Sequence, residues 1–392
     1  MLRLLLFSTK GSGSHYFGPG MSAYRMYKNI DKDNVTLSLA HGHTEQASLN
    51  LFDEQYCIGN LKSGGVTDLL LFLFKINKWV QKNAHKFDVV HCLGAFHASF
   101  MVAHSFQKAG VPSFIKITES KHTGFTESSF FSELIGFRRY RTKHANDVQG
   151  YIAISSEIEN KLSAAGVRKD KIIPIPNGVN TDRFKPADKT ERARLCNELG
   201  INNCFSILFT GAFSERKNPF VITKAFEKLD KSLKTQLILV GPDSDGGEQR
   251  NKIMNYIQSR SMENVILREH VADIEKYYQI SDLFVLPSNE EGLSNSMLEA
   301  MASGLPVCVT KVSGAEDIIK EYKNGTFINR SPDSISEAFQ SYINDSELHK
   351  KHSAGAFTTI KEGYDSKVIL QKHLDLFRNA KNLTLSESKT HV

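Results

Sequence analysis

The sequence is poor in cysteine and has no long apolar run, and each absence excludes a class of protein. Its 392 residues include five cysteines, no two of which form a Cys-x-x-Cys pair. An odd number of scattered cysteines does not fit a disulfide framework or a zinc-binding pattern, and it favours a reducing compartment. Residues 4–7 are apolar but too few for a signal-peptide core, and no stretch reaches the roughly 20 apolar residues of a membrane-spanning helix. We therefore expect a cytoplasmic protein that at most touches the inner face of the cytoplasmic membrane.

The charge of the chain is only mildly unbalanced. Lysine and arginine total 49 against 43 acidic residues, which gives a formal net charge of +6. That excess suits a phosphate-bearing ligand or an anionic membrane surface, but it does not indicate nucleic-acid binding. Hydrophobic residues make up 40% and charged residues 23% of the chain, which are ordinary values for a folded protein. A chain of this length usually forms two domains.

Short apolar runs alternate with amphipathic stretches, and this alternation occurs in two sets. Such a βαβ rhythm predicts parallel sheets with helices on both faces. The amphipathic stretches 66–83 and 97–109 are examples of the expected helices. The expected strands of the first set are residues 2–7, 35–40, 87–92, 113–118 and 150–155, and those of the second set are 205–210, 235–240, 264–268, 282–287 and 306–310.

A turn-rich connector, IPNGVNTDRFKP at residues 175–186, separates the two sets. We therefore expect an α/β protein with two Rossmann-like domains, residues 1–178 and 179–361, that face each other across a cleft. A helix at about residues 362–380 is expected to pack back on the first domain, and residues 382–392 are expected to form a flexible tail. In sheets of this type, ligands bind at the carboxyl ends of the strands.

The most informative segment is SNEEGLSNSMLEAMASGLP, residues 288–306, which leads from an expected strand through a loop into an expected helix. Gly292 allows the backbone to approach a ligand closely, and the unpaired N–H groups at the start of the helix favour a diphosphate. Glu291 precedes the helix and Glu299 lies inside it, so one carboxylate can reach a sugar and the other a ribose. Alternatively, Ser296 and Glu299 form a capping box, in which Glu299 only caps the helix.

The run E-G-L-x-N-x-x-x-E-A-M-A-x-G-L-P that starts at Glu291 resembles the signature of retaining glycosyltransferase family 4. The resemblance implies the GT-B fold, with a nucleotide-binding second domain and an acceptor-binding first domain. It implies that Glu291 contacts the donor sugar near the reacting face and that Glu299 holds the ribose of the nucleotide. It also implies donor-binding positions at Gly292, Leu293, Ser294 and Asn295.

A second candidate segment is TGAFSERKNP, residues 210–219, where Gly211 follows an expected strand and Arg216 and Lys217 precede a helix. Two cations at the carboxyl end of a strand suit a diphosphate, although a lone Arg-Lys pair is also typical of a solvated turn. The segment is similar to the G-R-L-x-x-x-K element of the same family, with Lys217 on the lysine. Ala212 stands where many members have the arginine, and Arg216 is the candidate that supplies that charge instead.

The first loop, residues 8–24, is rich in glycine. Gly11-x-Gly13 begins like a dinucleotide-binding fingerprint, but Tyr16 stands where the third glycine belongs, so NAD binding is disfavoured. Gly18 and Gly20 precede a helix and, by the resemblance, approach the donor diphosphate and the acceptor. The alternative is a plain flexible turn.

Two further motifs have competing interpretations. His122 follows an expected strand, and the resemblance makes it a candidate sugar contact with a catalytic role, although a lone histidine is more often structural. Asp243-Ser244-Asp245 is a DxD triplet, which binds a divalent metal in the other large fold of sugar transferases. Here it follows a strand where the resembling family has an ordinary loop, and its spacing does not fit a calcium loop. We therefore expect no bound metal and no cofactor.

The stretch FFSELIGFRRYRTKH, residues 130–144, mixes phenylalanine with Arg138, Arg139, Arg141 and Lys143. Such a segment can contact an anionic membrane or a lipid-diphosphate acceptor. It is also typical of a helix with one core face and one solvated basic face.

Together these observations predict a retaining glycosyltransferase that moves a hexosyl or N-acetylhexosaminyl group from a UDP- or GDP-sugar to an acceptor hydroxyl. The resemblance implies a glycan or lipid-linked acceptor in polysaccharide, lipopolysaccharide or lipid-linked glycan synthesis. The alternatives are a sugar-nucleotide epimerase or phosphorylase of the same fold, and a non-catalytic protein that binds nucleotide sugars.

Overall fold

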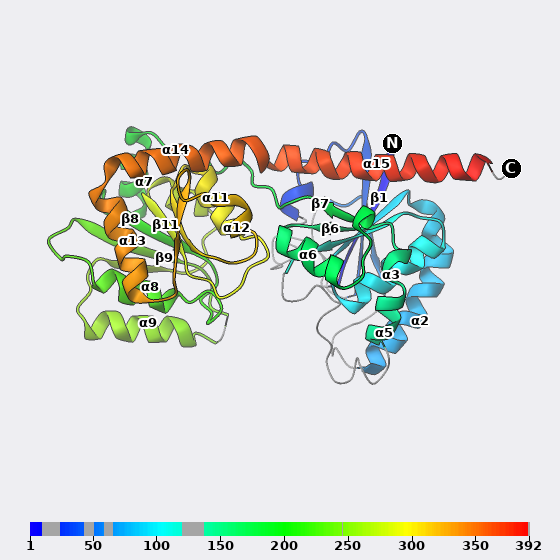
Figure 1. Cartoon of the computed structure of the whole chain (residues 1–392), viewed down its shortest axis with the longest axis horizontal. Helices are drawn as coiled ribbons and strands as arrows, with labels where there is room; N and C mark the ends of the chain where they lie inside the picture. Colours follow the sequence, from blue (N-terminus) through cyan, green and yellow to red (C-terminus); the bar gives the residue numbers. More distant parts are fainter. Residues whose placement is uncertain (10–23, 43–50, 59–65, 120–136, 245, 391–392) are drawn as a thin grey trace. The chain divides into compact units, whose positions relative to one another are not determined.

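A computed structural model of the chain describes residues 1–9, 24–42, 51–58, 66–119, 137–244 and 246–390. The chain divides into two compact units, which are coloured along the sequence in Figure 1. Unit 1 comprises Met1–Asn177 and Lys367–Val392, and unit 2 comprises Gly178–Ser366. The change of unit falls inside the connector that the sequence marks as rich in turns.

Unit 1 is built on a seven-stranded parallel sheet with the order β3-β2-β1-β4-β5-β6-β7. The central strand β1 is buried at every position except Arg3, because helices cover both faces of the sheet. The strands are β1 (Leu2–Ser8), β2 (Val35–His41), β3 (Glu54–Cys57), β4 (Val89–Leu93), β5 (Ser113–Ile117), β6 (Gly150–Ala153) and β7 (Ile172–Pro174). The helices of the N-terminal part are α2 (Val66–Asn83), α3 (His97–Lys108), α5 (Phe137–Lys143) and α6 (Ser156–Ala164), with the 3-10 turns η1 (Ala84–Lys86), η2 (Ala145–Asp147) and η3 (Lys169–Lys171).

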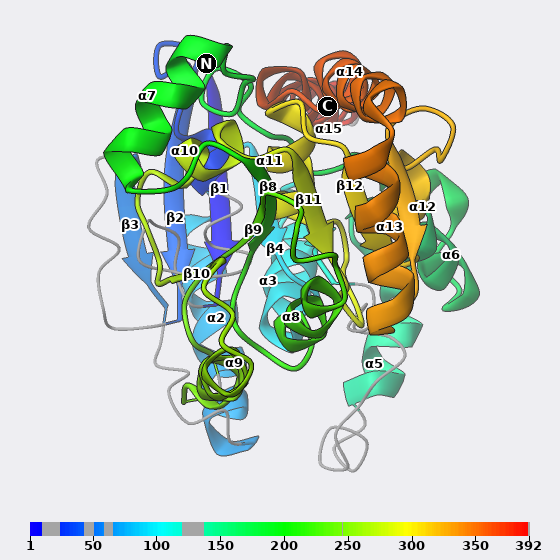
Figure 2. The same ribbon diagram turned by 90° about the vertical axis from the view of Figure 1, so that its left-hand side faces the viewer.

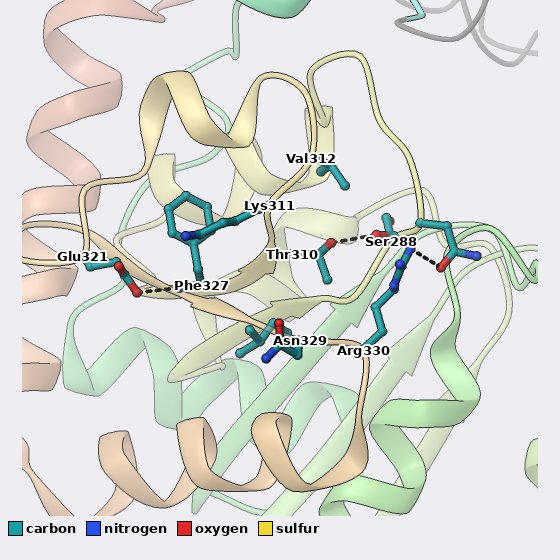
Figure 3. A pocket seen from close by; sticks show the side chains of 10 residues that line it. Ser288, Thr310, Lys311, Val312, Glu321, Phe327, Asn329 and Arg330 are labelled. Carbon is teal, nitrogen blue, oxygen red and sulfur yellow. Dashed lines mark hydrogen bonds between the residues drawn. The ribbon is translucent and has the colours of Figure 1, made fainter.

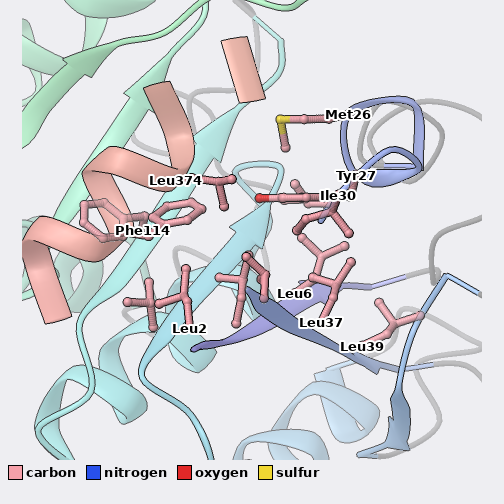
Figure 4. Close-up of a cluster of buried hydrophobic side chains, with 14 of the residues drawn as sticks. Leu2, Leu6, Met26, Tyr27, Ile30, Leu37, Leu39, Phe114 and Leu374 are labelled. Carbon is pink, nitrogen blue, oxygen red and sulfur yellow. The ribbon is translucent and has the colours of Figure 1, made fainter. Parts of the chain in front are cut away.

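The C-terminal helix α15 (Ser366–Thr390) completes the core of unit 1. Leu374 and Phe377 are buried in one cluster with Leu2 and Leu37 from the sheet (Figure 4). The Lys381 ammonium donates to the carboxylate of Asp88 at 2.9 Å and to the carbonyl oxygen of Met1 at 2.9 Å.

The residues expected to form a flexible tail from residue 382 continue helix α15 as far as Thr390. The Lys381 anchor lies immediately before this segment, and the Thr384 hydroxyl donates to the carbonyl oxygen of Ala380 at 3.1 Å. These contacts tie the start of this segment to unit 1 and to the preceding helical turn.

Unit 2 is built on a six-stranded parallel sheet with the order β10-β9-β8-β11-β12-β13. The chain moves outward from β8 to β10, then returns to place β11 against the other side of β8. Helices α8 and α13 lie side by side (Figure 2). The strands are β8 (Phe205–Thr210), β9 (Thr235–Val240), β10 (Val265–Arg268), β11 (Leu283–Leu286), β12 (Val307–Thr310) and β13 (Gly325–Ile328). The helices are α7 (Lys189–Leu199), α8 (Pro219–Glu227), α9 (Glu248–Ser259), α10 (Ile274–Gln279), α11 (Asn295–Ala302), α12 (Ala315–Ile318), α13 (Pro332–Asn344) and α14 (Ser346–Gly363).

All ten strands expected from the sequence are present, with ends that agree to within two residues. The three strands that the sequence pattern did not reveal, β3, β7 and β13, have only three or four residues and lie at edges of the sheets. An edge strand pairs on one side only, so it carries a weaker apolar signal than a central strand. Within the described ranges, no helix has both the length and the apolar character needed to cross a bilayer.

Candidate active site

The order of strands in unit 2 reverses between β8 and β11. These two strands are neighbours, with Leu283 paired to Ile207, and both point the same way. The loops that follow them therefore leave the sheet side by side, and open parallel sheets bind ligands at such a reversal. The loop after β8 carries Arg216 and Lys217, and the loop after β11 carries Glu291.

Lys217, Arg216 and Glu291 form an ion-paired cluster between these two loops. Glu291 Oε1 lies 2.5 Å from Lys217 Nζ and 3.2 Å from Arg216 Nη1. The side chains of Glu291 and Lys217 are only 10% and 11% exposed, whereas that of Arg216 is 51% exposed. Burial alone would raise the pKa of the Glu291 carboxyl, but Lys217 and Arg216 outweigh it and hold that pKa below its ordinary value. Glu291 is therefore ionised near neutral pH, and the cluster carries one excess positive charge.

Backbone contacts hold the two loops together around this cluster. The Asn289 N–H donates to the carbonyl oxygen of Arg216 at 2.8 Å, and Arg216 Nη1 donates to the carbonyl oxygen of Glu290 at 2.7 Å. The side chain of Lys217 runs past Gly211, where an added Cβ would lie 3.7 Å from its Cδ and Cε atoms. Gly211 therefore lies beside the part of the Lys217 side chain that carries the ammonium group to Glu291.

Glycine at position 241 lets the ends of β8 and β9 approach each other. A Cβ built on Gly241 would lie 1.8 Å from the carbonyl oxygen of Gly211, closer than any two such atoms can come. The Gly211 N–H donates to the carbonyl oxygen of Val240 at 3.0 Å. Gly241 had no signal of this role in the sequence, although it directly follows an expected strand.

Gly314, which was also missed, supports the loop after β11 from the other side. It has a φ of +74°, and a Cβ there would lie 2.6 Å from the carbonyl oxygen of Gly292 and 2.9 Å from the Cα of Leu293. Leu293 itself is 5% exposed. The segment after β12 thus packs directly under the backbone that leads into α11.

Replacing Gly314 with alanine is expected to destabilise the fold by about 1–3 kcal/mol beyond the cost of its positive φ, because the new Cβ overlaps backbone atoms. Gly200→Ala is the matched control, since Gly200 has a φ of +64° and nothing lies within 4 Å of an added Cβ. Thermal unfolding of the two variants measures the difference. Equal losses would contradict the close packing between the two loops.

The start of helix α11 corrects the capping-box interpretation. The helix begins at Asn295, and Ser294 is its N-cap, whose hydroxyl accepts from the Met297 N–H at 3.4 Å. Glu299 is therefore the fifth helical residue and not the third, which a capping box requires. The expected partner, Ser296, lies inside the helix.

Glu299 is 6% exposed and faces the end of β8. The Tyr278 hydroxyl donates to Glu299 Oε2 at 2.9 Å and also lies within hydrogen-bond distance of the Thr210 hydroxyl. Because the phenolic proton is given to the carboxylate, Thr210 donates to Tyr278. Tyr278, at the end of α10 (Ile274–Gln279), had no signal in the sequence other than an amphipathic position.

A cavity of about 610 Å³ opens at the carboxyl ends of β11, β12 and β13 (Figure 3). The Thr310 hydroxyl donates to the carbonyl oxygen of Ser288 at 2.6 Å, and Arg330 Nη1 donates to Asn289 Oδ1 at 3.1 Å. Since residues 288 and 289 lead directly into Glu291, the cavity adjoins the ion-paired cluster. It is lined by Ser288, Asn289, Thr310, Lys311, Val312, Glu321, Phe327, Ile328, Asn329 and Arg330.

Most of the residues singled out from the sequence lie at this one edge of unit 2. They share the loops after β8 and β11 or the first turns of α11. These residues are Gly211, Arg216, Lys217, Glu291, Gly292, Leu293, Ser294, Asn295 and Glu299. His122, Gly18 and Gly20 lie outside the residues that the structure describes, and so does Asp245 of the DxD triplet.

The described residues of the DxD triplet, Asp243 and Ser244, are already engaged in contacts with other residues. Asp243 Oδ1 lies 2.7 Å from Nε of Arg250, and the Ser244 hydroxyl donates to the carbonyl oxygen of Phe213 at 3.0 Å.

In the basic stretch, Arg138, Arg139 and Lys143 are exposed, but Arg141 is buried, and its Nη1 atom contacts His97 Nδ1 at 3.3 Å. The predicted solvated basic face is thus wrong for Arg141, since α5 turns this position toward α3.

Comparison with known proteins identifies two family matches. Residues 195–358 match glycosyl transferases group 1, and residues 18–183 match Glycosyltransferase Family 4. Capsular polysaccharide biosynthesis glycosyltransferase CapM of Staphylococcus aureus is 25% identical over 247 residues, which are 61% of this chain and 62% of that protein. UDP-Gal:alpha-D-GlcNAc-diphosphoundecaprenol alpha-1,3-galactosyltransferase of Escherichia coli is 31% identical over 170 residues, which are 40% of this chain and 41% of that protein. The chain thus spans less than two thirds of either relative.

The fold is shared with a solved structure, that of Anabaena HepE in complex with UDP-glucose. The TM-score is 0.76 at 19% sequence identity, and the likeness covers 97% of this chain and 100% of that one. This likeness concerns the fold and not the substrate. With a family match in each unit and two parallel-sheet units of this architecture, the chain belongs to glycosyltransferase family 4 and has the GT-B fold.

Proposed function

We propose that this chain is a retaining glycosyltransferase that transfers a hexosyl or N-acetylhexosaminyl group from a nucleotide-diphosphate sugar to an acceptor hydroxyl. The observation that carries the proposal is the buried Lys217–Glu291 ion pair with Arg216 beside it, at the strand-order reversal of unit 2. The two cations of this cluster can bind a diphosphate, and its carboxylate can face a sugar. All three groups lie side by side on loops that the backbone holds together.

The donor is oriented by three groups of residues. The diphosphate binds Lys217 and Arg216 and the N–H groups at the start of α11, around Gly292, Leu293, Ser294 and Asn295. The sugar lies against Glu291, and the ribose binds Glu299, whose carboxylate the Tyr278 hydroxyl orients. When the diphosphate binds, it competes with Glu291 for the two cations, so the carboxylate becomes available to the sugar.

The reaction is a displacement at the anomeric carbon with retained configuration. The bond from that carbon to the phosphate oxygen breaks, and a bond to the acceptor oxygen forms on the same face of the ring. The departing diphosphate takes the acceptor proton, while Lys217 and Arg216 stabilise its growing negative charge. Glu291 stabilises the positive charge at the anomeric carbon. Because its pKa is lowered, Glu291 is a weak base, which fits this role better than proton abstraction.

A UDP-sugar is the first choice of donor, with a GDP-sugar as the second. HepE was solved with UDP-glucose, and the Escherichia coli relative is named for a UDP-galactose donor. Thermal-shift measurements with UDP-, GDP- and ADP-sugars identify the donor, because a ligand that binds only the folded state raises the melting temperature. Stabilisation by none of the three would contradict the proposed donor class.

The acceptor is a glycan or a lipid-linked glycan. The relatives named above act in capsular polysaccharide synthesis and on a diphosphoundecaprenol-linked sugar. The exposed Arg138, Arg139 and Lys143 suit a lipid diphosphate or the anionic face of a membrane. Nucleic acid is not a partner in this proposal.

Acceptor-dependent release of the nucleoside diphosphate distinguishes transfer from the alternatives. Incubation with UDP-sugar and a lipid-linked or glycan acceptor is expected to give free UDP and an elongated acceptor together. UDP release without acceptor would indicate a hydrolase, and an epimeric UDP-sugar as product would indicate an epimerase of the same fold. Sugar 1-phosphate formed from a glycan and added inorganic phosphate would indicate a phosphorylase. Binding without any turnover would indicate a non-catalytic protein.

Replacing Glu299 with alanine is expected to weaken UDP binding by about 1–3 kcal/mol, roughly 5- to 150-fold in Kd, since a hydrogen bond to a charged group is lost. Glu299→Gln keeps an acceptor oxygen and is expected to lose less. Calorimetric titration with UDP measures both. An unchanged UDP affinity in Glu299→Ala, with a lowered melting temperature, would assign Glu299 a purely structural role.

Removal of divalent metal with EDTA is expected to leave the transfer rate unchanged at temperatures well below unfolding. The cations that stabilise the leaving group in this proposal are Lys217 and Arg216, and Asp243 already pairs with Arg250. Initial rates with and without EDTA test this. A loss of activity that magnesium reverses would contradict it and make Asp243-Ser244-Asp245 a metal site.

A further inference from the structure

A second cluster of chemically reactive side chains lies in unit 1, apart from the residues of the proposed reaction. His104 comes from α3, His144 directly follows α5, and Asp147 ends the 3-10 turn η2. The atoms with which these three side chains would bind a metal all lie within 4.8 Å of one another. Two imidazoles and a carboxylate are a donor set typical of zinc and related divalent transition metals.

His104 is the least expected member of this cluster. It is 2% exposed, and within the described part of the chain neither of its ring nitrogens has a hydrogen-bond partner. Its neighbours are mainly aromatic, with the Phe100 ring stacked at 5.9 Å and the Tyr140 ring edge-on at 5.7 Å. A buried polar group without a partner costs free energy. A buried histidine without a hydrogen-bond partner therefore indicates a bound ligand more strongly than a solvated histidine does.

The distances within the cluster suit an ion between the side chains. His104 Nδ1 is 3.9 Å from Asp147 Oδ2, too far for a hydrogen bond. Two ligand atoms on one tetrahedral zinc lie about 3.4 Å apart, since each bond is about 2.0–2.2 Å long. The His144 and Asp147 side chains, which are 2.5 Å apart, must separate by roughly 1 Å to share a metal. Both are partly exposed, at 23% and 48%, so both can move.

We propose that His104, His144 and Asp147 form a binding site for one divalent transition metal, with zinc as the best-fitting ion and a water molecule as the fourth ligand. The metal would join the last turns of α3 to the continuous α5–η2 segment, which lies beyond β5 along the chain. Its role is structural, because the residues proposed to bind the donor and to act in the transfer step lie in unit 2, and the basic residues of α5 proposed to meet the acceptor are not metal ligands. The proposal is therefore independent of the proposed donor site and chemistry.

The test is zinc binding by the full chain, after removal of any histidine tag and of metal by chelation. Calorimetric titration with zinc chloride is expected to show one site per chain, and zinc is expected to raise the melting temperature by a few degrees. Cobalt(II) is expected to give the visible absorption of a tetrahedral site. His144→Ala and Asp147→Asn are expected to weaken zinc binding at least about 100-fold, because each removes a direct ligand.

The controls are His85→Ala and Asp170→Asn, which change an exposed histidine and an exposed aspartate of unit 1 outside the cluster. Both are expected to bind zinc like the unchanged chain. Since His144 and Asp147 are partly exposed, their variants are expected to fold, and circular dichroism checks this. Asp147→Glu, which keeps a carboxylate, is the second variant if Asp147→Asn unfolds.

Absence of stoichiometric zinc binding, or binding that His144→Ala and Asp147→Asn both retain, would overturn the proposal and leave an ordinary His144–Asp147 ion pair. Chelation is expected to lower the melting temperature without abolishing sugar transfer, which separates this proposal from the proposed function.

Discussion

Replacement of Lys217 by alanine is expected to lower the rate of sugar transfer by roughly 10²–10³-fold, the usual effect of removing one group that stabilises transition-state charge. Lys217 is the most buried cation of the candidate site, and its ammonium already lies 2.5 Å from the carboxylate that would face the sugar. Its charge therefore acts where water is largely excluded, and an electrostatic interaction is stronger there than in solvent. Single-turnover rates and donor Kd values separate an effect on chemistry from one on binding.

Two variants serve as references for Lys217→Ala. Lys234→Ala removes an exposed lysine that precedes β9, at the amino ends of the strands and so away from the candidate site. It is expected to leave the transfer rate unchanged. Arg216→Ala is expected to have a smaller effect than Lys217→Ala, because Arg216 is half-exposed and its charge is screened by solvent. If Lys217→Ala weakened donor binding and slowed the chemical step equally, or changed only the KM, a role in the transition state would be contradicted.

Replacement of Glu291 by glutamine is expected to change catalysis and nucleotide binding in opposite directions. The transfer rate is expected to fall by roughly 10³-fold, since a carboxylate about 4 Å from a positive centre contributes about 4 kcal/mol at an effective dielectric constant of about 20. UDP alone is expected to bind as tightly as before or more tightly, because Lys217 and Arg216 are released from their ion pairs. Glu290→Gln, in the same loop, is the control and is expected to retain most of the activity.

The opposite signs make the Glu291 experiment specific. Loss of both the transfer rate and UDP affinity would indicate that the substitution disrupts the loop after β11, and an unchanged rate would remove Glu291 from the reaction. The pH dependence of unfolding gives an independent check. Because the pKa of Glu291 is lowered in the fold, its ion pair stabilises the protein above the ordinary carboxyl pKa, and this contribution is lost as the pH falls through the lowered value. Glu291→Gln is expected to lack that acid-side loss.

Much of the site could be located from the sequence because its parts are local. A strand, a loop and a helix start are encoded within about 20 residues, so the placement of Lys217 and Glu291 after two strands is visible in the apolar pattern. The family resemblance added their expected roles, which remain predictions. Glu299 illustrates the limit of local reasoning: Ser296 and Glu299 have the spacing of a capping box, but the helix begins two residues earlier than that motif requires, with Ser294 as the cap.

Residues that act through contacts distant in the sequence were not predicted. Tyr278 reaches Glu299 from another helix, and Gly241 and Gly314 matter because of the backbone that each one meets. A glycine after a strand is common, so its pattern alone does not reveal a close approach. The histidine cluster of unit 1 was missed for a related reason, because His104 is far from His144 and Asp147 along the chain and meets them only in the fold.

By itself, the amino-acid sequence determined two α/β sets of strands, the connector between them, and which side chains stand at the ends of which strands. These properties follow from apolar periodicity and turn-forming residues, which act over short stretches of chain. The tertiary structure alone decided that β11 lies against β8, that Lys217 thereby pairs with Glu291, and that α15 returns to the core of unit 1. Strand order and helix docking depend on how buried surfaces from distant segments fit together, and no short stretch of sequence carries that information.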